Sequence, residues 1–229
     1  GYTALALTDE CSLAGVVRAH VHAKEHPGFK LIVGSEMRLA MSPVNEGPVG
    51  SMRLVLLAED LRGYKNLSHW ITVARRRADK GSYQAFTADL EGQVPDAPGL
   101  AGLPGCRALL IPQPGQSVDE VMAQAWWLKT WFQDRAAIAI ELLLRATDDV
   151  LLAAVQHAAA EFPELCEAET KAFAEVLGTH VQRLATIVNG DCACTTHVPL
   201  QPDPAPPLRR TARAGSVPTR FFPAAACRK

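Results

Sequence analysis

Short apolar runs alternate along this chain with longer segments in which apolar residues recur at helical spacing. The runs are continuously apolar, as expected of strands that are covered on both faces of a sheet. Each run has the length of a single strand and is bounded by charged residues, glycine or proline. We predict strands at 3–8, 30–35, 53–58, 107–112, 136–143 and 184–189.

Amphipathic segments separate these runs. In the first, Leu13, Val16, Val17 and Val21 fall on one helical face, and Pro27-Gly28 ends the segment. Ser117 is a suitable N-cap for a later one. We predict helices at 11–26, 60–77, 118–132, 148–161 and 164–181, with loops at 41–51 and 92–105.

Strands that alternate with helices predict an α/β fold in which helices cover a parallel sheet. Parallel neighbours require crossover connections, and these are right-handed. A barrel and a doubly wound open sheet both satisfy this pattern.

Composition narrows the class of protein. The 229 residues are 48% hydrophobic and 21% charged, enough to bury the core of one domain. A net charge of −1 gives no overall field that favours nucleic acid or a membrane. No apolar run reaches the roughly 18 residues that span a bilayer, so we expect no membrane partner. Six cysteines without regular spacing favour a reducing, cytoplasmic location over a disulfide framework.

The character of the chain changes near residue 192. Residues 199–229 contain seven prolines, and 204–229 contain six Lys or Arg and no acidic residue. No periodicity persists there, so we predict a disordered C-terminal tail at 192–229.

Acidic residues fall at or near the ends of predicted strands. Asp9 follows the first and Glu36 the second, Glu141 lies on the fifth, and Asp191 follows the sixth. Sites in parallel α/β folds form where strands end, and carboxylates there can bind cations or act as bases. An Asp after a strand can equally be a turn residue or a helix cap. Both interpretations of these carboxylates stay open at this point.

Other polar groups favour structural roles. His20 and His22 fall on a predicted helix, where residues two apart point in different directions and cannot chelate one metal ion. Arg75, Arg76 and Arg77 end a helix, where the dipole favours cations, although contact with nucleic-acid phosphates is a second possibility. Trp127 and Trp131 have the spacing of residues that pack into a core.

Four segments resemble, in order, the PHP (polymerase and histidinol phosphatase) domain of error-prone bacterial C-family DNA polymerases. They are GYTALALTDECSLAGVVRAH at 1–20, KLIVGSEMRL at 30–39, RLVLLAEDLRGYKNLSHWITVARRRADKGSY at 53–83 and FQDRAAIAIELL at 132–143. The resemblance extends to about residue 161. It implies a seven-stranded, distorted (β/α) barrel, of which 1–191 would be an incomplete copy without the family's first strand. Self-association through the open barrel edge is therefore expected.

The resemblance also implies metal chemistry. In intact relatives, His, Asp and Glu at the strand ends hold divalent Mg, Mn or Zn for phosphoester hydrolysis. Asp9, Glu36 and Asp191 match metal-ligand positions, whereas Glu10 and Arg53 stand where the family has histidine. We therefore expect a vestigial metal site and no catalytic residue.

Two functions follow from this resemblance. The first is an inactive structural fragment of a polymerase whose partners would be DNA and other translesion-synthesis proteins. The alternative is a stand-alone metal-dependent phosphoesterase or 3′–5′ exonuclease.

Overall fold

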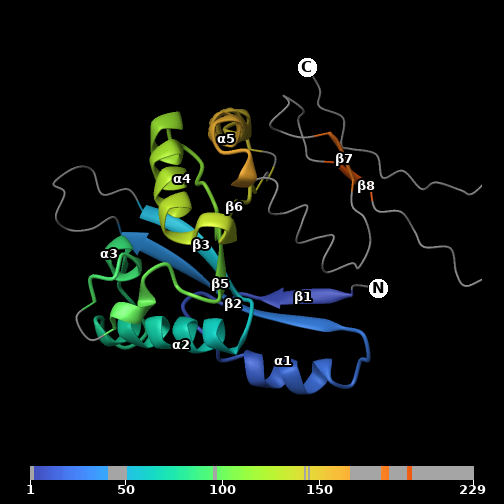
Figure 1. Cartoon of the computed structure of the whole chain (residues 1–229), viewed down its shortest axis with the longest axis vertical. Helices are drawn as coiled ribbons and strands as arrows, with labels where there is room; N and C mark the ends of the chain where they lie inside the picture. Colours follow the sequence, from blue (N-terminus) through green and yellow to red (C-terminus); the bar gives the residue numbers. More distant parts are fainter. Residues whose placement is uncertain are drawn as a thin grey trace, which may run out of the picture. The chain divides into compact units, whose positions relative to one another are not determined.

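The computed structural model describes residues 3–40, 51–94, 97–141, 143 and 145–165, and the backbone of 182–185 and 195–197. The chain divides into two units, Gly1–Ala168 and Glu169–Lys229, and Figure 1 labels their helices and strands. In the described part of the first unit the strands are β1 (Ala4–Leu7), β2 (Lys30–Ala40), β3 (Ser51–Ala58), β4 (Ala85–Phe86), β5 (Cys106–Leu110) and β6 (Ala136–Ile138). Its helices are α1 (Val16–Ala23), α2 (Leu61–Arg76), α3 (Thr87–Leu90), η1 (Pro98–Leu100), α4 (Val118–Phe132), η2 (Gln133–Arg135) and α5 (Asp148–Glu161).

The strands form one mixed sheet in the order β1-β2-β3-β5-β6, with β4 beside the end of β2. β1, β4 and β6 pair in parallel with their neighbours, but β3 is antiparallel to both β2 and β5. The predicted all-parallel sheet is therefore wrong at β3. Only ten residues separate Ala40 from Ser51, and a parallel crossover needs a dozen or more.

The predicted α/β fold is confirmed, with a mixed sheet. The seven-stranded barrel is not confirmed. Among the described residues the sheet is open, with β1 and β6 at its two ends. Association through the free edge of β1 stays a prediction.

Several strands and helices begin or end at other residues than predicted. The second strand runs to Ala40 and not to residue 35, so Glu36 lies inside it, and the strand 136–143 ends at Ile138. The helix predicted at 11–26 spans only Val16–Ala23. Cys11 has a φ of 45°, a left-handed conformation that no right-handed helix accommodates. Val17 and Val21, predicted on the apolar face of this helix, are 70% and 54% exposed.

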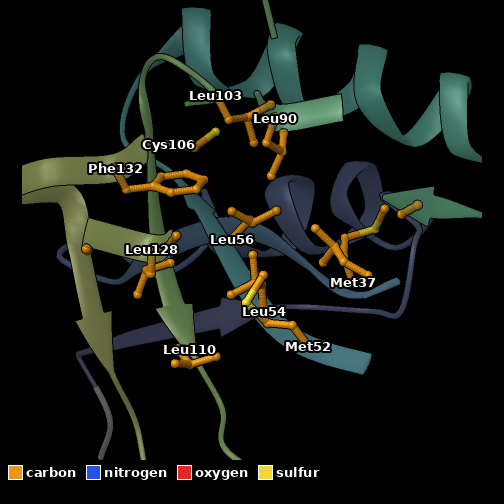
Figure 2. Close-up of a cluster of buried hydrophobic side chains, with 14 of the residues drawn as sticks. Met37, Met52, Leu54, Leu56, Leu90, Leu103, Cys106, Leu110, Leu128 and Phe132 are labelled. Carbon is orange, nitrogen blue, oxygen red and sulfur yellow. The ribbon is translucent and has the colours of Figure 1, made fainter. Parts of the chain in front are cut away.

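Alternation along β2 and β3 creates two unlike faces. One face supplies Met37, Leu39, Leu54 and Leu56 to the core, where buried side chains of α2 and α4 join them (Figure 2). The other face carries Glu36, Arg38 and Arg53, none of which is fully buried. The polar face is therefore the one on which a site can form.

Helix starts follow the predicted capping chemistry. The Ser117 hydroxyl accepts a hydrogen bond from the Glu120 N–H at 3.2 Å, and Glu120 bonds back to the Ser117 N–H at 2.7 Å. Asp60 caps α2 in the same way by accepting from the Gly63 N–H at 2.7 Å. The Ser117 prediction is confirmed.

In the second unit the described backbone forms one antiparallel pair, β7 (Gln182–Ala185) with β8 (Thr195–His197). β7 overlaps the start of the strand predicted at 184–189, and β8 falls within the segment 192–229 that we expected to be disordered. Most of the helix predicted at 164–181 and all of 198–229 lie outside the described residues. No helix in the described part of the chain combines the length and apolar character needed to cross a membrane.

Candidate functional site

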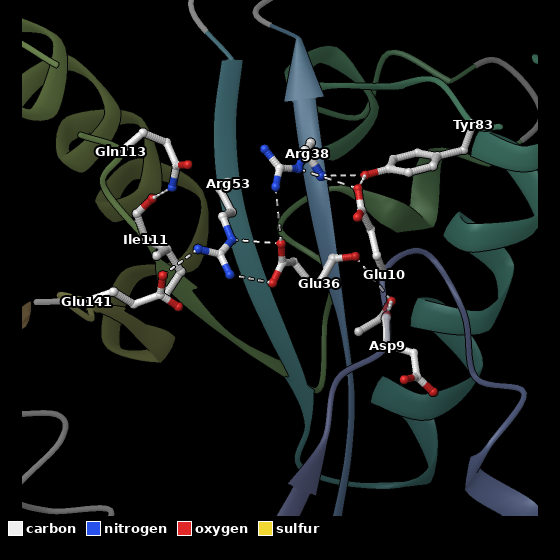
Figure 3. Close-up of polar contacts among 10 residues, drawn as sticks. Asp9, Glu10, Glu36, Arg38, Arg53, Tyr83, Ile111, Gln113 and Glu141 are labelled. Carbon is white, nitrogen blue, oxygen red and sulfur yellow. Dashed lines mark hydrogen bonds and ion pairs between the residues drawn. The ribbon is translucent and has the colours of Figure 1, made fainter. Parts of the chain in front are cut away.

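The polar face of the sheet centres on an ion pair between Glu36 on β2 and Arg53 on β3 (Figure 3). The Nε and Nη2 atoms of Arg53 donate to Oε1 and Oε2 of Glu36, each at 2.7 Å. The two side chains are only 19% and 16% exposed. One guanidinium therefore occupies both carboxylate oxygens in the two-pronged geometry that makes Arg–carboxylate pairs strong.

Arg53 also reaches a third segment of the chain. Its Nη1 donates to Oε2 of Glu141 at 2.8 Å, and Glu141 follows β6. Arg53 thus joins two adjacent strands to a segment 88 residues further along the chain. Glu141 had been predicted on a strand, but it lies beyond the end of that strand.

This arrangement sets the charge states of the pair. The hydrogen bonds from Arg53 hold the pKa of Glu36 below its ordinary value of 4.5, against the opposing effect of burial. The same bonds from Glu36 and then Glu141 raise the pKa of Arg53. The guanidinium is a permanent cation at the centre of the polar face.

A second polar group lies beside the first. The carboxylate of Glu10 accepts a hydrogen bond from the Tyr83 hydroxyl at 2.8 Å and lies 3.5 Å from the Nε of Arg38. The backbone N–H of Arg38 donates to the same hydroxyl at 3.0 Å. Burial, with the bond to Glu10, raises the pKa of Tyr83 to about 12, so the phenol stays protonated at neutral pH.

Asp9 is adjacent to this network through its backbone. Its carbonyl oxygen accepts from the Ser35 hydroxyl at 2.8 Å and from the Glu36 N–H at 3.3 Å. Its carboxylate is exposed, has no hydrogen bond to any described residue, and points away from Glu36 in Figure 3. Asp9 also does not cap α1, which begins after Gly15. The cap interpretation of Asp9 is wrong, and its carboxylate is not directed at the Glu36 pair.

Asp191, the third predicted ligand, lies outside the described residues. Within the part of the chain that the structure describes, no three His, Cys, Asp or Glu side chains are placed to share a metal ion.

The three arginines at the end of α2 differ in their surroundings. Arg75 donates to the carbonyl oxygen of Cys11 at 3.0 and 3.1 Å and to that of Ser82 at 3.1 Å. Arg77 pairs with the buried Asp89 at 2.7 Å. Arg76 is exposed and contacts no charged partner among the described residues. Two of the three arginines therefore have structural contacts.

The remaining aromatic and histidine predictions agree with the structure. Trp127 and Trp131 pack against the core, and the Trp127 indole donates to Glu91 at 2.7 Å. His20 and His22 lie exposed on α1.

The sequence analysis did not predict the contacts among Glu10, Arg38 and Tyr83. The alternation Glu36-x-Arg38 was a signal for a charged sheet face, but the contacts with Glu10 and Tyr83 come from segments outside that strand.

A scan against protein families matches the PHP domain model to residues 1–142. The chain belongs to the PHP domain family. Curated proteins similar to this PHP domain are named "Error-prone DNA polymerase". The one from Bordetella parapertussis is 46% identical over 159 residues, and the one from Pseudomonas aeruginosa is 48% identical over 161. Each match covers 69% of this chain but only 15% and 13% of the respective polymerase.

A crystal structure from Bifidobacterium adolescentis, assigned as a metal-dependent phosphoesterase, is also similar. It aligns over 77% of this chain and 46% of its own, with 18% identity and a TM-score of 0.25. Similarity at that level does not establish a shared activity.

The residues of this PHP domain do not fit the metal centre that the family resemblance implies. Both oxygens of Glu36 are bound by a cation, and Glu10 and Arg53 replace the expected imidazoles. A divalent ion at Glu36 would have to displace a guanidinium and remain beside it. The donor set therefore favours arginine over a metal ion at this position.

Proposed function

We propose that this chain is the PHP module of an error-prone DNA polymerase and that it supports the fold of that enzyme without hydrolysing phosphoesters. The identities of 46% and 48% to curated polymerases support the first part. The observation that carries the second is the Arg53 guanidinium on both oxygens of Glu36. Because the chain spans about 15% of such a polymerase, DNA synthesis with Mg²⁺, translesion synthesis and repair in the cytoplasm would belong to the whole protein.

Electrostatic repulsion from Arg53 supports the proposal that no metal ion binds at Glu36. Two unit charges about 4 Å apart near a protein surface interact with roughly 4 kcal/mol, and a divalent ion doubles that repulsion. Metal binding at Glu36 would have to overcome this repulsion and the loss of two charge-assisted hydrogen bonds at 2.7 Å. Carboxylates alone, without imidazole ligands, do not offset that cost for a transition metal such as Zn²⁺.

Arg53 also has a structural role in this proposal. A metal ion draws carboxylates from separate elements to one point, and Arg53 does the same for Glu36 within β2 and Glu141 after β6. The domain would thereby keep β2, β3 and the segment after β6 in place with a side chain of its own.

The alternative function, metal-dependent hydrolysis of a phosphoester or a DNA 3′ end, has one observation in its favour. Asp9 presents an exposed carboxylate without a partner among the described residues, two residues before a left-handed Cys11 that turns the chain. A metal ion held there would need ligands from residues beyond those described.

The test measures metal binding and hydrolysis on the full chain. We expect calorimetry to show no Mn²⁺ or Zn²⁺ binding to the wild type at micromolar concentrations, and no release of label from a 3′-labelled oligonucleotide. Arg53→Ala should increase Mn²⁺ affinity more than Arg38→Ala, because only Arg53 covers both oxygens of Glu36. Metal-dependent hydrolysis by the wild type that Asp9→Ala abolishes would overturn the proposal in favour of the alternative.

A further inference from the structure

α2 presents an exposed face made of basic side chains. The helix Leu61–Arg76 contains no Asp or Glu, although acidic residues slightly outnumber basic ones in the whole chain. We call this surface the α2 basic face, and it consists of Arg62, Lys65, His69 and Arg76.

Helical geometry places these side chains on one side. Counted from Arg62, they stand at i, i+3, i+7 and i+14, which is the spacing of a single stripe. The buried residues of α2, such as Leu67 and Trp70, lie on the opposite side and enter the core. The stripe therefore faces solvent along the whole helix.

Arg75 and Arg77 do not belong to this surface. Arg75 is turned toward the carbonyl oxygens of Cys11 and Ser82, and Arg77 toward Asp89. The structure thus divides the arginine run and leaves only Arg76 on the basic face.

The cations of the α2 basic face are not neutralised. The side chains of Arg62, Lys65 and Arg76 are exposed, and they form no hydrogen bond or ion pair with any residue that the structure describes. Elsewhere on the described surface, Arg38, Arg53, Arg77 and Arg107 each pair with a carboxylate. A row of cations without carboxylates, on a rigid helix, is complementary to a row of anions.

We infer that the α2 basic face binds the phosphate backbone of DNA. Fourteen residues of helix rise about 21 Å at about 1.5 Å per residue. Phosphates along one DNA strand follow at about 3.4 Å, so the stripe is long enough to meet several of them. The choice of DNA among polyanions rests on the proposed kinship with DNA polymerases. The side chains are long and flexible, so the contact would be with phosphates and would not distinguish sequences.

The experiment compares two triple variants of the full chain by fluorescence anisotropy. One carries Arg62→Gln, Lys65→Gln and Arg76→Gln. The control carries Arg18→Gln, Lys24→Gln and Arg145→Gln, which are exposed cations on α1, at its C-cap and before α5. Both remove three positive charges, and Gln keeps a helix propensity close to that of Lys and Arg. Labelled 20-nucleotide single strands and 20-base-pair duplexes are titrated at several NaCl concentrations.

We expect the wild type to bind DNA at low salt and the α2 variant to bind at least about tenfold more weakly. Its slope of log affinity against log salt should fall by 2 to 3, since each lost phosphate contact removes about 0.9. The control should stay within about twofold of the wild type. No binding by the wild type at 50 mM NaCl, or equal losses in the two variants, would overturn the inference. Binding to vesicles of anionic lipid with no binding to DNA would overturn it as well. None of these outcomes bears on Arg53, whose role is tested by metal binding.

Discussion

Arg53 and Glu36 form their ion pair diagonally across two antiparallel strands. In the register of β2 and β3, Arg53 stands opposite Arg38, and Glu36 stands opposite Val55. Like charges directly opposite each other destabilise a sheet. Glu36 lies between the two arginines. Arg53 reaches along its strand to Glu36 with both bonds at 2.7 Å, and the Nη2 atom of Arg38 lies 4.0 Å from the same carboxylate. Glu36, an expected metal ligand, thus offsets the charges of both arginines within the sheet.

Removing this guanidinium should destabilise the domain. We expect Arg53→Ala to lower the free energy of unfolding by about 2–4 kcal/mol, because it removes both charge-assisted hydrogen bonds of a mostly buried carboxylate and leaves it only the more distant Arg38, at 4.0 Å. Arg107→Ala is the matched control, since Arg107 pairs with the more exposed Glu59 at 2.9 Å and should cost about 0–1 kcal/mol. Urea unfolding followed by tryptophan fluorescence measures both. Equal losses of unfolding free energy in the two variants would show that the Arg53–Glu36 pair stabilises the domain no more than the exposed Arg107–Glu59 pair does.

The lowered pKa of Glu36 predicts how stability depends on pH. A carboxylate whose pKa is depressed in the folded state stabilises the fold above its ordinary value, here 4.5, and this contribution is lost as pH falls through the folded value. The wild type should therefore exceed Glu36→Gln in stability at pH 7, and the difference should shrink below pH 4.5. Urea midpoints at pH 7, 5, 4 and 3 follow this difference. A difference that stays constant down to pH 3 would contradict the assignment.

The sequence predicted where strands and helices lie better than it predicted the direction of each strand in the sheet. Most apolar runs became strands and Ser117 capped its helix, because burial and capping are local properties. The direction of β3 was missed because the strands predicted at 30–35 and 53–58 left room for a crossover, whereas β2 continues to Ala40 and leaves only ten residues before β3. The first helix begins at Val16 and not at residue 11, and no residue pattern revealed the left-handed backbone of Cys11 at the predicted start.

The site was only partly predictable for a similar reason. Family resemblance marked Glu36 and Arg53 as positions of interest, and the structure adds that they bind each other. Pairing between side chains 17 positions apart requires the strand register, which composition and spacing do not supply. The contacts of Arg75 with Cys11 and Ser82 likewise depend on how α2 lies against the loop after β1.

Gly63 should not tolerate a side chain. It lies in the first turn of α2, where an added Cβ would overlap the carbonyl group of Gly105 before β5. Gly63→Ala should therefore cost at least about 1–3 kcal/mol, since neither backbone segment can yield without moving α2 away from the sheet. Gly99→Ala is the control, because a Cβ there meets nothing within 4 Å. Thermal unfolding of the two variants should show a lowered midpoint for Gly63→Ala alone.

Arg75 should prove to be a positioning residue for the loop after β1. Its guanidinium donates to the Cys11 carbonyl at 3.0 and 3.1 Å, and Arg75→Ala leaves that oxygen without these donors. We expect a loss of about 1–3 kcal/mol in stability and faster hydrogen exchange in peptides that span Asp9 to Ser12. Arg76→Ala should change stability by less than about 0.5 kcal/mol and leave that exchange unaltered, because Arg76 is exposed and unpaired among the described residues. Unchanged exchange in Arg75→Ala would mean that the loop is held by other contacts, such as the bond from the Cys11 N–H to the Glu36 carbonyl at 2.8 Å.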